Sequence, residues 1–294
     1  MAAFEPWPAL ASFAKTDGAG VFYYDVPPRS GDKEEAPLLL LIHGLGDEAD
    51  SWRRLIPPLC AAGYRVLAPD LPGFGRSAGK GSRLRRHALA VLSLLEGASK
   101  KPAVLAGSSM GAVVAELAVL LKPGAADSMI LIDGCMPLGA ALSPSLLCMA
   151  LPFIGKKWYR SYRNRPQAAW ESLYPYYADL EALPEEDRAF LKKRVMDRVR
   201  SPSQERAYFA SLRSMISACL FGAASFERAL RNWPGRIGLI WGEQDRVMRR
   251  TQAENLMGIR RDAELSIIPG AGHLPHQDKP EETAAAILRF RPPR

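Results

Sequence analysis

The residues best suited to chemistry lie in Gly107-Ser108-Ser109-Met110-Gly111, which matches the pattern G-x-S-x-G. An apolar run precedes this segment and a run of helix-forming residues follows it, so Ser109 is expected on a sharp turn from a strand into a helix. The two glycines leave room for such a turn because they have no Cβ, and the helix N-terminus offers free N–H groups to developing negative charge. The segment predicts Ser109 as a nucleophile and Ser108 as a neighbour that points elsewhere.

A serine hydroxyl is a weak nucleophile until a base removes its proton. The chain has four histidines, and one of them, His273, follows Gly270-Ala271-Gly272 in a loop after the last predicted strand. Glycines there allow the backbone to bring an imidazole close to another loop, so we predict His273 as the base. His276, three residues further on, is the alternative base, but we expect it to be a neighbour at the rim of the cleft. We expect His43 to pack or hydrogen-bond beneath its own loop, and His87, within a basic helical stretch, to lie at the surface.

The base needs a carboxylate that fixes its tautomer and stabilises the imidazolium. Asp245 follows a predicted strand and lies between Ser109 and His273 in the sequence. We predict Asp245 as this carboxylate, with Asp133, at the end of the preceding strand, and Glu243 as alternatives. Each of the three carboxylates could instead cap a helix or be solvated in a loop.

Attack on a carbonyl group creates an oxyanion, which needs hydrogen-bond donors that are already in place. His43-Gly44-Leu45-Gly46 ends the first buried strand, and the backbone N–H groups of Leu45 and Met110 are predicted to converge on one oxygen. Losing one such donor typically costs about a hundredfold to a thousandfold in rate. This chemistry needs no metal and no organic cofactor, and the sequence offers no clear site for either.

Short apolar runs alternate with helical stretches along most of the chain, which is typical of a parallel sheet with crossover helices. Helices are predicted at Met110–Leu121, which is apolar on nearly all sides and should be buried, and at Pro280–Phe290. The predicted nucleophile, acid and base each follow a strand. Those strands are predicted at residues 37–43, 64–70, 102–108, 127–133, 236–241 and 263–269, with an antiparallel strand at residues 20–26.

Residues 134–232 interrupt this alternation and contain no convincing strand. Apolar residues repeat every four positions within Pro184–Arg200, which predicts a helix, and Ser201-Pro202-Ser203-Gln204 resembles a capping box that opens another helix. We interpret the segment as a helical cap inserted over the carboxyl edge of the sheet, since strands resume after it; an independent helical domain is disfavoured for the same reason. The predicted organisation is a core in two parts, residues 1–134 and 233–294, with the cap at residues 135–232.

Taken in order, these motifs resemble those of the α/β-hydrolase superfamily, in its capped serine-nucleophile branch of esterase-like and C–C-hydrolase-like enzymes. The resemblance implies an α/β fold with a mostly parallel central β-sheet flanked by helices, an inserted helical cap, and the order Ser, Asp, His along the chain. It covers residues 38–290, although residues 135–232 match only as a helix-rich cap. The matching segments are His43–Gly46, the turn Pro69–Ser77 (PDLPGFGRS), the elbow Gly107–Gly111, the acid loop Trp241–Asp245 and the histidine loop Gly270–His273.

The elbow serine argues against the epoxide hydrolase and dehalogenase activities of the superfamily, whose enzymes carry aspartate at that position. No H-G-G-G run follows the first buried strand, which weakens a link to the lipases that use that motif. The resemblance implies hydrolysis of a carboxylic ester through an acyl-enzyme, with a small-molecule ester as the partner. A C–C bond hydrolase, amidase, thioesterase or acyltransferase on the same triad stays open, and a ligand receptor without turnover is less favoured.

Composition and charge set the remaining expectations. Hydrophobic residues make up 48% of the 294 residues and charged residues 24%, which supplies enough apolar side chains for a packed core. The net charge is +8, most of it in residues 135–232, but no nucleic-acid-reading motif is present, so we expect no nucleic-acid partner. The sequence has no run of 18 apolar residues, no secretory signal pattern and no paired-cysteine pattern, which predicts a reduced, cytoplasmic protein without a transmembrane segment.

Overall fold

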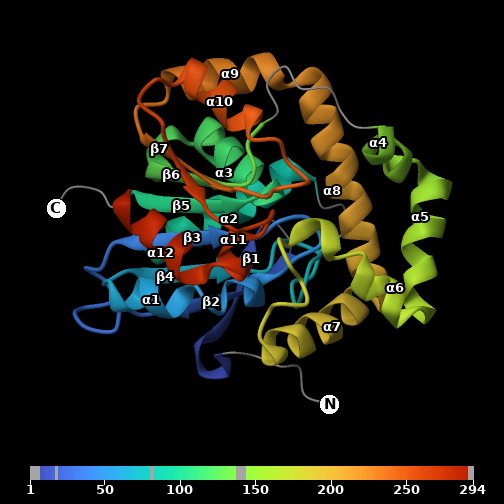
Figure 1. Ribbon diagram of the computed structural model, residues 1–294. Coiled ribbons are helices and arrows are strands. Elements are labelled where there is room, and N and C mark those ends of the chain that lie inside the picture. The colour runs from blue at the N-terminus through green and yellow to red at the C-terminus, as the bar shows by residue number, and fades with distance from the viewer. Residues whose placement is uncertain (1–6, 17–18, 80–82, 137–143, 291–294) are drawn as a thin grey trace.

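The computed structural model describes residues 7–16, 19–79, 83–136 and 144–290 of the chain. Its core is an eight-stranded sheet with the strand order β1-β2-β4-β3-β5-β6-β7-β8 (Figure 1). Strand β2 pairs antiparallel with β1 and β4, and every other neighbouring pair is parallel. The strands are β1 Ala11–Thr16, β2 Ala19–Val26, β3 Leu38–Ile42, β4 Arg65–Pro69, β5 Ala103–Ser108, β6 Ala126–Ile132, β7 Arg236–Gly242 and β8 Glu264–Ile268.

The strand predictions are confirmed to within one residue at each end, because strands buried on both faces read as continuous apolar runs. Strand β1 is absent from the prediction. Its alanine, serine and lysine residues have weak strand propensity, and Phe13 is 67% exposed. Pairing with β2 along its whole length holds β1 at the edge of the sheet, a tertiary contact that local sequence does not reveal.

Alternate side chains of the buried strands enter two different hydrophobic clusters. In β3 the first, third and fifth residues join one cluster with helices α2 (Leu84–Ala98) and α3 (Met110–Leu121), whereas the second and fourth join another with α1 (Ile56–Ala61) and α12 (Pro280–Arg289). This alternation follows the two-residue period of a strand, so helices cover both faces of the sheet. Helix α3 is buried along most of its length, as its apolar composition predicts.

Between β6 and β7 the described residues form α-helices and short 3₁₀ turns but no strand, which gives the predicted helical insertion. Figure 1 shows α4 to α8 together on one side of the core, whereas α9 lies beside α10. Phe226 and Leu230 of α9 join the larger core cluster. The domain boundaries at residues 134 and 232 stay predictions. The helices are α4 Pro144–Ala150, α5 Pro152–Ser161, α6 Pro166–Glu171, α7 Glu185–Arg200, α8 Pro202–Phe221, α9 Ala223–Asn232, α10 Thr251–Ile259 and α11 Pro275–Asp278, and the 3₁₀ turns are η1 Pro8–Leu10, η2 Ala49–Trp52, η3 Pro123–Ala125, η4 Tyr162–Asn164 and η5 Tyr174–Tyr176.

Helices α7 and α8 begin where the sequence indicates. Helix α7 buries Leu191, Val195 and Val199 on one face. The Ser201 hydroxyl accepts a hydrogen bond from the N–H of Gln204 at 3.3 Å, which caps the N-terminus of α8. Both helix predictions in this region are therefore confirmed.

No single described helix is long and apolar enough to span a bilayer. Helices α8 and α9 have that length and composition only together, as a pair bent by 78°. Cys60, Cys135, Cys148 and Cys219 are free cysteines.

Candidate active site

Ser109 occupies the turn that joins β5 to α3. Its backbone has φ 53° and ψ −116°, a conformation that residues other than glycine rarely adopt. The N–H of Ser109 donates to the Ile132 carbonyl at 2.9 Å, and the N–H of Ala112 donates to the Ser109 carbonyl at 3.0 Å. These bonds to β6 and within α3 hold the serine in a backbone conformation that typically costs about 1–3 kcal/mol.

The two glycines of the elbow are required by close packing. A Cβ on Gly107 would meet the carbonyl oxygen of Gly111, and a Cβ on Gly111 would meet the carbonyl oxygen of Ile42 in β3. Helix α3 can therefore begin directly against the ends of β3 and β5 only when both positions lack a side chain. Ser108 is fully buried and Ser109 is half-buried, so the two serines lie in different environments, as predicted.

The loop of residues 43–46, which follows β3, lies against Ser109. The Cβ position of Gly44 is 3.4 Å from Ser109 Cβ and 4.0 Å from Ser109 Oγ. Leu45 comes next in this loop, and Met110 is the first residue of α3, where the N–H has no acceptor within the helix. The two predicted donors thus belong to the two segments that flank the serine. Their convergence on a substrate oxygen stays a prediction.

His43 fixes the backbone of this loop. The N–H of Leu71 donates to His43 Nε2 at 2.8 Å, so Nδ1 carries the ring proton and donates to the Gly44 carbonyl at 2.8 Å. Burial lowers the pKa of His43, which keeps the ring neutral. The expectation that His43 packs and hydrogen-bonds beneath the loop is confirmed.

Asp245 and His273 form a buried pair on the loops that follow β7 and β8. His273 Nδ1 lies 2.9 Å from Asp245 Oδ2, and both side chains are at most 2% exposed. Asp245 Oδ1 accepts hydrogen bonds from the N–H groups of Val247 at 2.7 Å and Met248 at 2.9 Å, so its own loop fixes the carboxylate. Because an ionised carboxylate can only accept, Nδ1 carries the proton and His273 Nε2 is the basic nitrogen.

Asp133 lies beside that pair, immediately after β6. Its Oδ1 accepts a hydrogen bond from the N–H of Gly242 at 2.8 Å, and its backbone has φ 44°. The polar side-chain atoms of Asp133, Asp245 and His273 lie within 4.8 Å of one another. Burial, and then the charge of Asp245, raises the pKa of Asp133 well above its usual range. A second carboxyl group is therefore present at the pair, although the hydrogen bond of His273 goes to Asp245.

Two other side chains named as alternatives contact other partners. Glu243 is exposed and accepts a hydrogen bond from the N–H of Gly270 at 3.0 Å. His276 is buried, with its ring centroid 4.1 Å from that of Trp52, rather than at the rim of a cleft. Burial lowers the pKa of His276 to about 3, so its ring is neutral.

His87 lies in the interior, so the prediction that it is a surface residue is wrong. Its side chain is fully buried on α2, its ring packs 5.8 Å from that of Phe74, and Nε2 lies 2.9 Å from Ser211 Oγ on α8. The physical reason is helical periodicity: Leu84, His87 and Ala88 share one face of α2, and that face packs inward. The basic neighbours of His87 in the sequence point in other directions.

Gly134 connects the serine with the Asp245–His273 pair. A Cβ on Gly134 would meet the backbone of Ser109, while the preceding residue, Asp133, lies beside Asp245 and His273. Among the contacts of the described residues, no hydrogen bond joins Ser109 Oγ to His273. Hydrogen bonds of this kind are often long before a substrate binds. The contact between base and nucleophile therefore stays a prediction.

One group of described side chains is close enough to offer three ligand atoms to a metal ion, and it consists of Asp133, Asp245 and His273. The hydrogen bond between Asp245 and His273 already uses two of these side chains. The expectation that no metal or organic cofactor is needed stays a prediction.

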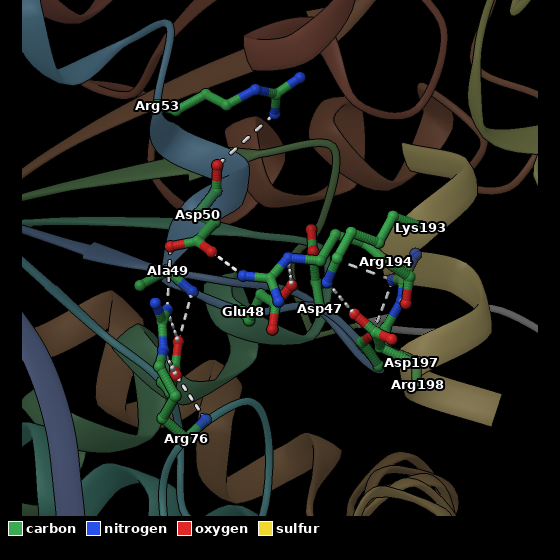
Figure 2. Close-up of polar contacts among 12 residues, drawn as sticks. Asp47, Glu48, Ala49, Asp50, Arg53, Arg76, Lys193, Arg194, Asp197 and Arg198 are labelled. Carbon is green, nitrogen blue, oxygen red and sulfur yellow. Dashed lines mark hydrogen bonds and ion pairs between the residues drawn. The ribbon is translucent and has the colours of Figure 1, made fainter. Parts of the chain in front are cut away.

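A charged network that is not among the predicted site residues surrounds the segment after residue 46 (Figure 2). Its core half is built on Asp70, whose Oδ1 accepts from the N–H of Ala49 at 2.7 Å and whose Oδ2 lies 2.8 Å from Arg76 Nε. Arg76 also binds Asp50 at 2.9 Å. Gly75 has φ +50°, and a Cβ there would meet the Asp70 carboxylate. The turn Pro69–Ser77 therefore braces the segment that continues from the loop beside Ser109.

The other half of the network comes from α7, which belongs to the helical insertion. Arg194 pairs with Glu48 at 2.8 Å and also with Asp50, and Arg198 donates to the Gly46 carbonyl at 2.7 Å. Burial raises the pKa of Glu48 to about 7, although the neighbouring Arg194 opposes the shift. Arg194 and Asp50 are 144 residues apart in the sequence, which explains why no local pattern predicts their pairing.

Comparisons with known proteins agree with this architecture. A family profile described as the alpha/beta hydrolase family matches residues 39–286. The uncharacterized hydrolase YugF of Bacillus subtilis is 26% identical over 279 residues, which cover 93% of this chain and 95% of that protein. Epoxide hydrolase A of Mycobacterium tuberculosis is 29% identical over 309 residues, which cover 87% of this chain and 90% of that protein.

Solved structures share the fold at lower identity. The 2-hydroxy-6-oxo-6-phenylhexa-2,4-dienoate hydrolase of Rhodococcus sp. strain RHA1 has a TM-score of 0.74 and 21% identity, covering 95% of this chain and 99% of that one. An alpha/beta hydrolase fold protein of Burkholderia ambifaria has a TM-score of 0.76 and 21% identity, covering 95% of this chain and 97% of that one. At these identities the likeness supports the fold alone.

Proposed function

The chain belongs to the alpha/beta hydrolase family, and from this premise we propose that it hydrolyses a carboxylic ester through an acyl-enzyme. The nucleophile is Ser109, the base is His273, and Asp245 orients the base. The substrate is a small molecule that enters between the cap and the sheet, and the reaction uses no metal and no organic cofactor. We further expect a cytoplasmic location, which rests on the sequence alone.

In the first half of the reaction, Ser109 Oγ attacks the ester carbonyl carbon while His273 Nε2 accepts the hydroxyl proton. The carbonyl electrons move onto oxygen, and the N–H groups of Leu45 and Met110 bind the resulting oxyanion. Asp245 stabilises the imidazolium through Nδ1. The intermediate then collapses: the bond to the leaving oxygen breaks, His273 gives its proton to the departing alcohol, and the acyl group stays on Ser109.

The second half repeats these steps with water as the nucleophile. His273 Nε2 accepts a proton from water, and the hydroxide oxygen adds to the acyl carbon. The same two N–H groups bind the second oxyanion. When the intermediate collapses, the bond to Ser109 Oγ breaks and His273 returns the proton to the serine. The carboxylic acid leaves, and the enzyme is restored.

One observation carries this proposal: Ser109 lies on a strained turn directly against residues 43–46, at the sheet edge that also holds the buried Asp245–His273 pair. Parallel strands β5, β7 and β8 end at this edge, so the loops after them gather there. An imidazole that a carboxylate holds in place, together with a serine beside a helix N-terminus, is an arrangement typical of acyl transfer. The serine also separates this chain from the epoxide hydrolases of the superfamily, which use aspartate.

Labelling with a fluorophosphonate tests the assignment of the nucleophile. We expect the wild-type protein to be labelled at Ser109, and Ser109→Ala to lose both labelling and at least about a thousandfold of its ester hydrolysis. Ser108→Ala is the matched control and should keep both, because Ser108 Oγ is buried and has no hydrogen-bond partner among the described residues. If Ser109→Ala is labelled at another serine with equal activity, the assignment is wrong.

The alternative reactions use the same side chains, so the bond that is cleaved has to be measured. Short-chain aryl esters should be cleaved faster than a vinylogous diketone of similar size. The reverse preference would replace the ester with a C–C bond while keeping the roles of Ser109 and His273.

A further inference from the structure

Helix α7 of the cap contacts the loop that carries Leu45 through two arginines on one helical face. Arg194 and Arg198 are four residues apart, so both side chains point the same way (Figure 2). Arg194 binds carboxylates, pairing with Glu48 at 2.8 Å and with Asp50. Arg198 binds the backbone at shorter range than it binds a carboxylate: its Nη1 donates to the Gly46 carbonyl at 2.7 Å and lies 3.9 Å from Asp47 Oδ1.

The core fixes this segment of chain on both sides of Gly46. Before it, His43 is held through its ring by the N–H of Leu71 at 2.8 Å. After it, the N–H of Ala49 donates to Asp70 at 2.7 Å, and the Tyr24 hydroxyl donates to Asp50 at 2.9 Å. Between these two anchors, the hydrogen bond to the Gly46 carbonyl comes from the cap.

Helices α7 and α8 both contact the loop of residues 43–46 at Gly46. The Gly46 φ of +75° is readily adopted by glycine, and the Tyr208 ring of α8 lies 3.3 Å from the position of a Cβ there. The Gly46 carbonyl is only two peptide units beyond the Leu45 N–H. A shift of the Gly46 peptide can therefore be passed along the chain to the Leu45 donor, whose own peptide is also held at the Gly44 carbonyl by His43 Nδ1 at 2.8 Å.

We propose that Arg198 is a positioning residue for the oxyanion donor at Leu45. When α7 packs against the core, the same contact orients the Leu45 N–H. The inference rests on the proposed function. Arg198 touches no reacting atom and acts through the Gly46 carbonyl. The cap would then set the rate of the chemical step in addition to covering the substrate.

The test compares an oxygen ester with the matching thionoester in wild type and Arg198→Gln. The carbonyl sulfur of a thionoester is larger and accepts hydrogen bonds more weakly than oxygen, so the ratio of the two kcat/KM values reports on the oxyanion donors. We expect Arg198→Gln to lose about 10- to 100-fold in kcat for the oxygen ester with KM nearly unchanged, since the donor is misplaced rather than removed. The oxygen-to-sulfur ratio should fall at least fivefold.

Two further variants separate positioning from general loosening of the cap. Lys193→Gln is the matched control, because Lys193 lies on the same helix but pairs with Asp197 at 2.7 Å on the exposed face. It should keep the wild-type ratio within twofold. Arg198→Lys retains the charge and one donor, so its kcat and its ratio should lie between those of wild type and Arg198→Gln. It also serves as the test if Arg198→Gln does not fold.

The inference is overturned if folded Arg198→Gln, with an intact thermal transition, keeps the wild-type oxygen-to-sulfur ratio, whether or not kcat falls. Fluorophosphonate labelling of wild type is measured first. If Ser109 is not labelled, the proposed function fails and this inference fails with it. If Ser109 is labelled and the ratio does not respond to Arg198, only this inference fails.

Discussion

At the scale of single residues, two carboxyl groups lie beside one imidazole, and different contacts hold them. Asp245 accepts three hydrogen bonds, from His273 Nδ1 and from two N–H groups of its own loop. Asp133 accepts one, from the N–H of Gly242, and is fully buried. The donors around Asp245 fix the orientation of its carboxylate, whereas burial favours the neutral form of Asp133, so the two groups are suited to different roles.

Replacing each carboxyl group with an amide distinguishes these roles. Asp245→Asn should lower kcat for ester hydrolysis by about 10⁴-fold, because the amide cannot hold the imidazole in the correct tautomer. Asp133→Asn should cost less than about tenfold at pH 7, because burial raises the pKa of Asp133 and favours its neutral form, which an amide resembles. The measurement is kcat of both purified variants. A larger loss in Asp133→Asn would make Asp133 the carboxylate that orients His273.

At the scale of elements, the approach of α3 to β3 depends on Gly111. A methyl group there would meet the Ile42 carbonyl, so the helix would have to move away from the strand. We expect Gly111→Ala to lower the free energy of unfolding by about 1–3 kcal/mol, the usual cost of overpacking, and to reduce ester hydrolysis because Ser109 moves with the helix. Urea unfolding and a hydrolysis assay measure the two effects.

Gly97, near the end of α2, provides the comparison for that variant. A Cβ on Gly97 would have nothing within 4 Å, so Gly97→Ala should be neutral or should stabilise by up to about 1 kcal/mol through helix propensity. If both substitutions shift the urea midpoint equally, the contact with Ile42 has no special importance.

The helices and strands also show which features of the fold and the site can be predicted from local sequence. Buried parallel strands are predictable because both faces must be apolar, and Ser109 is predictable because its turn requires glycines on both sides. The buried face of α2 is visible in the spacing of Leu84, His87 and Ala88, although the basic charges nearby suggest a surface position for His87. The contact of Arg198 with Gly46 has no local signal, since it joins residues 152 positions apart.

At the scale of the whole molecule, one buried acid of the core links stability to pH. Glu116 of α3 accepts a hydrogen bond from the N–H of Met136 at 2.8 Å, and burial raises the pKa of Glu116 to about 8, from an ordinary value of 4.5. Between these two values the folded chain holds a proton that the unfolded chain has lost. The free energy of unfolding therefore falls through this group as the pH rises from 4.5 to 8, and the contribution is constant above 8.

Glu116→Gln removes that dependence. At pH 5 the variant should match wild type, because both side chains are neutral in the folded state. As the pH rises to 8, the variant should become more stable than wild type by on the order of a few kcal/mol, since each pKa unit is worth about 1.4 kcal/mol. Thermal unfolding from pH 5 to pH 9 measures the difference. Glu227→Gln, at an exposed site on α9, should show no such divergence.

The contacts between α7 and the core are shielded from solvent. The Arg194 and Arg198 side chains are 10% and 17% exposed, and Asp50 is fully buried. Dissolved ions weaken attractions between charges that face water but reach enclosed pairs poorly. High salt should therefore leave α7 bound to the core, and the direction of the Leu45 N–H should not depend on ionic strength.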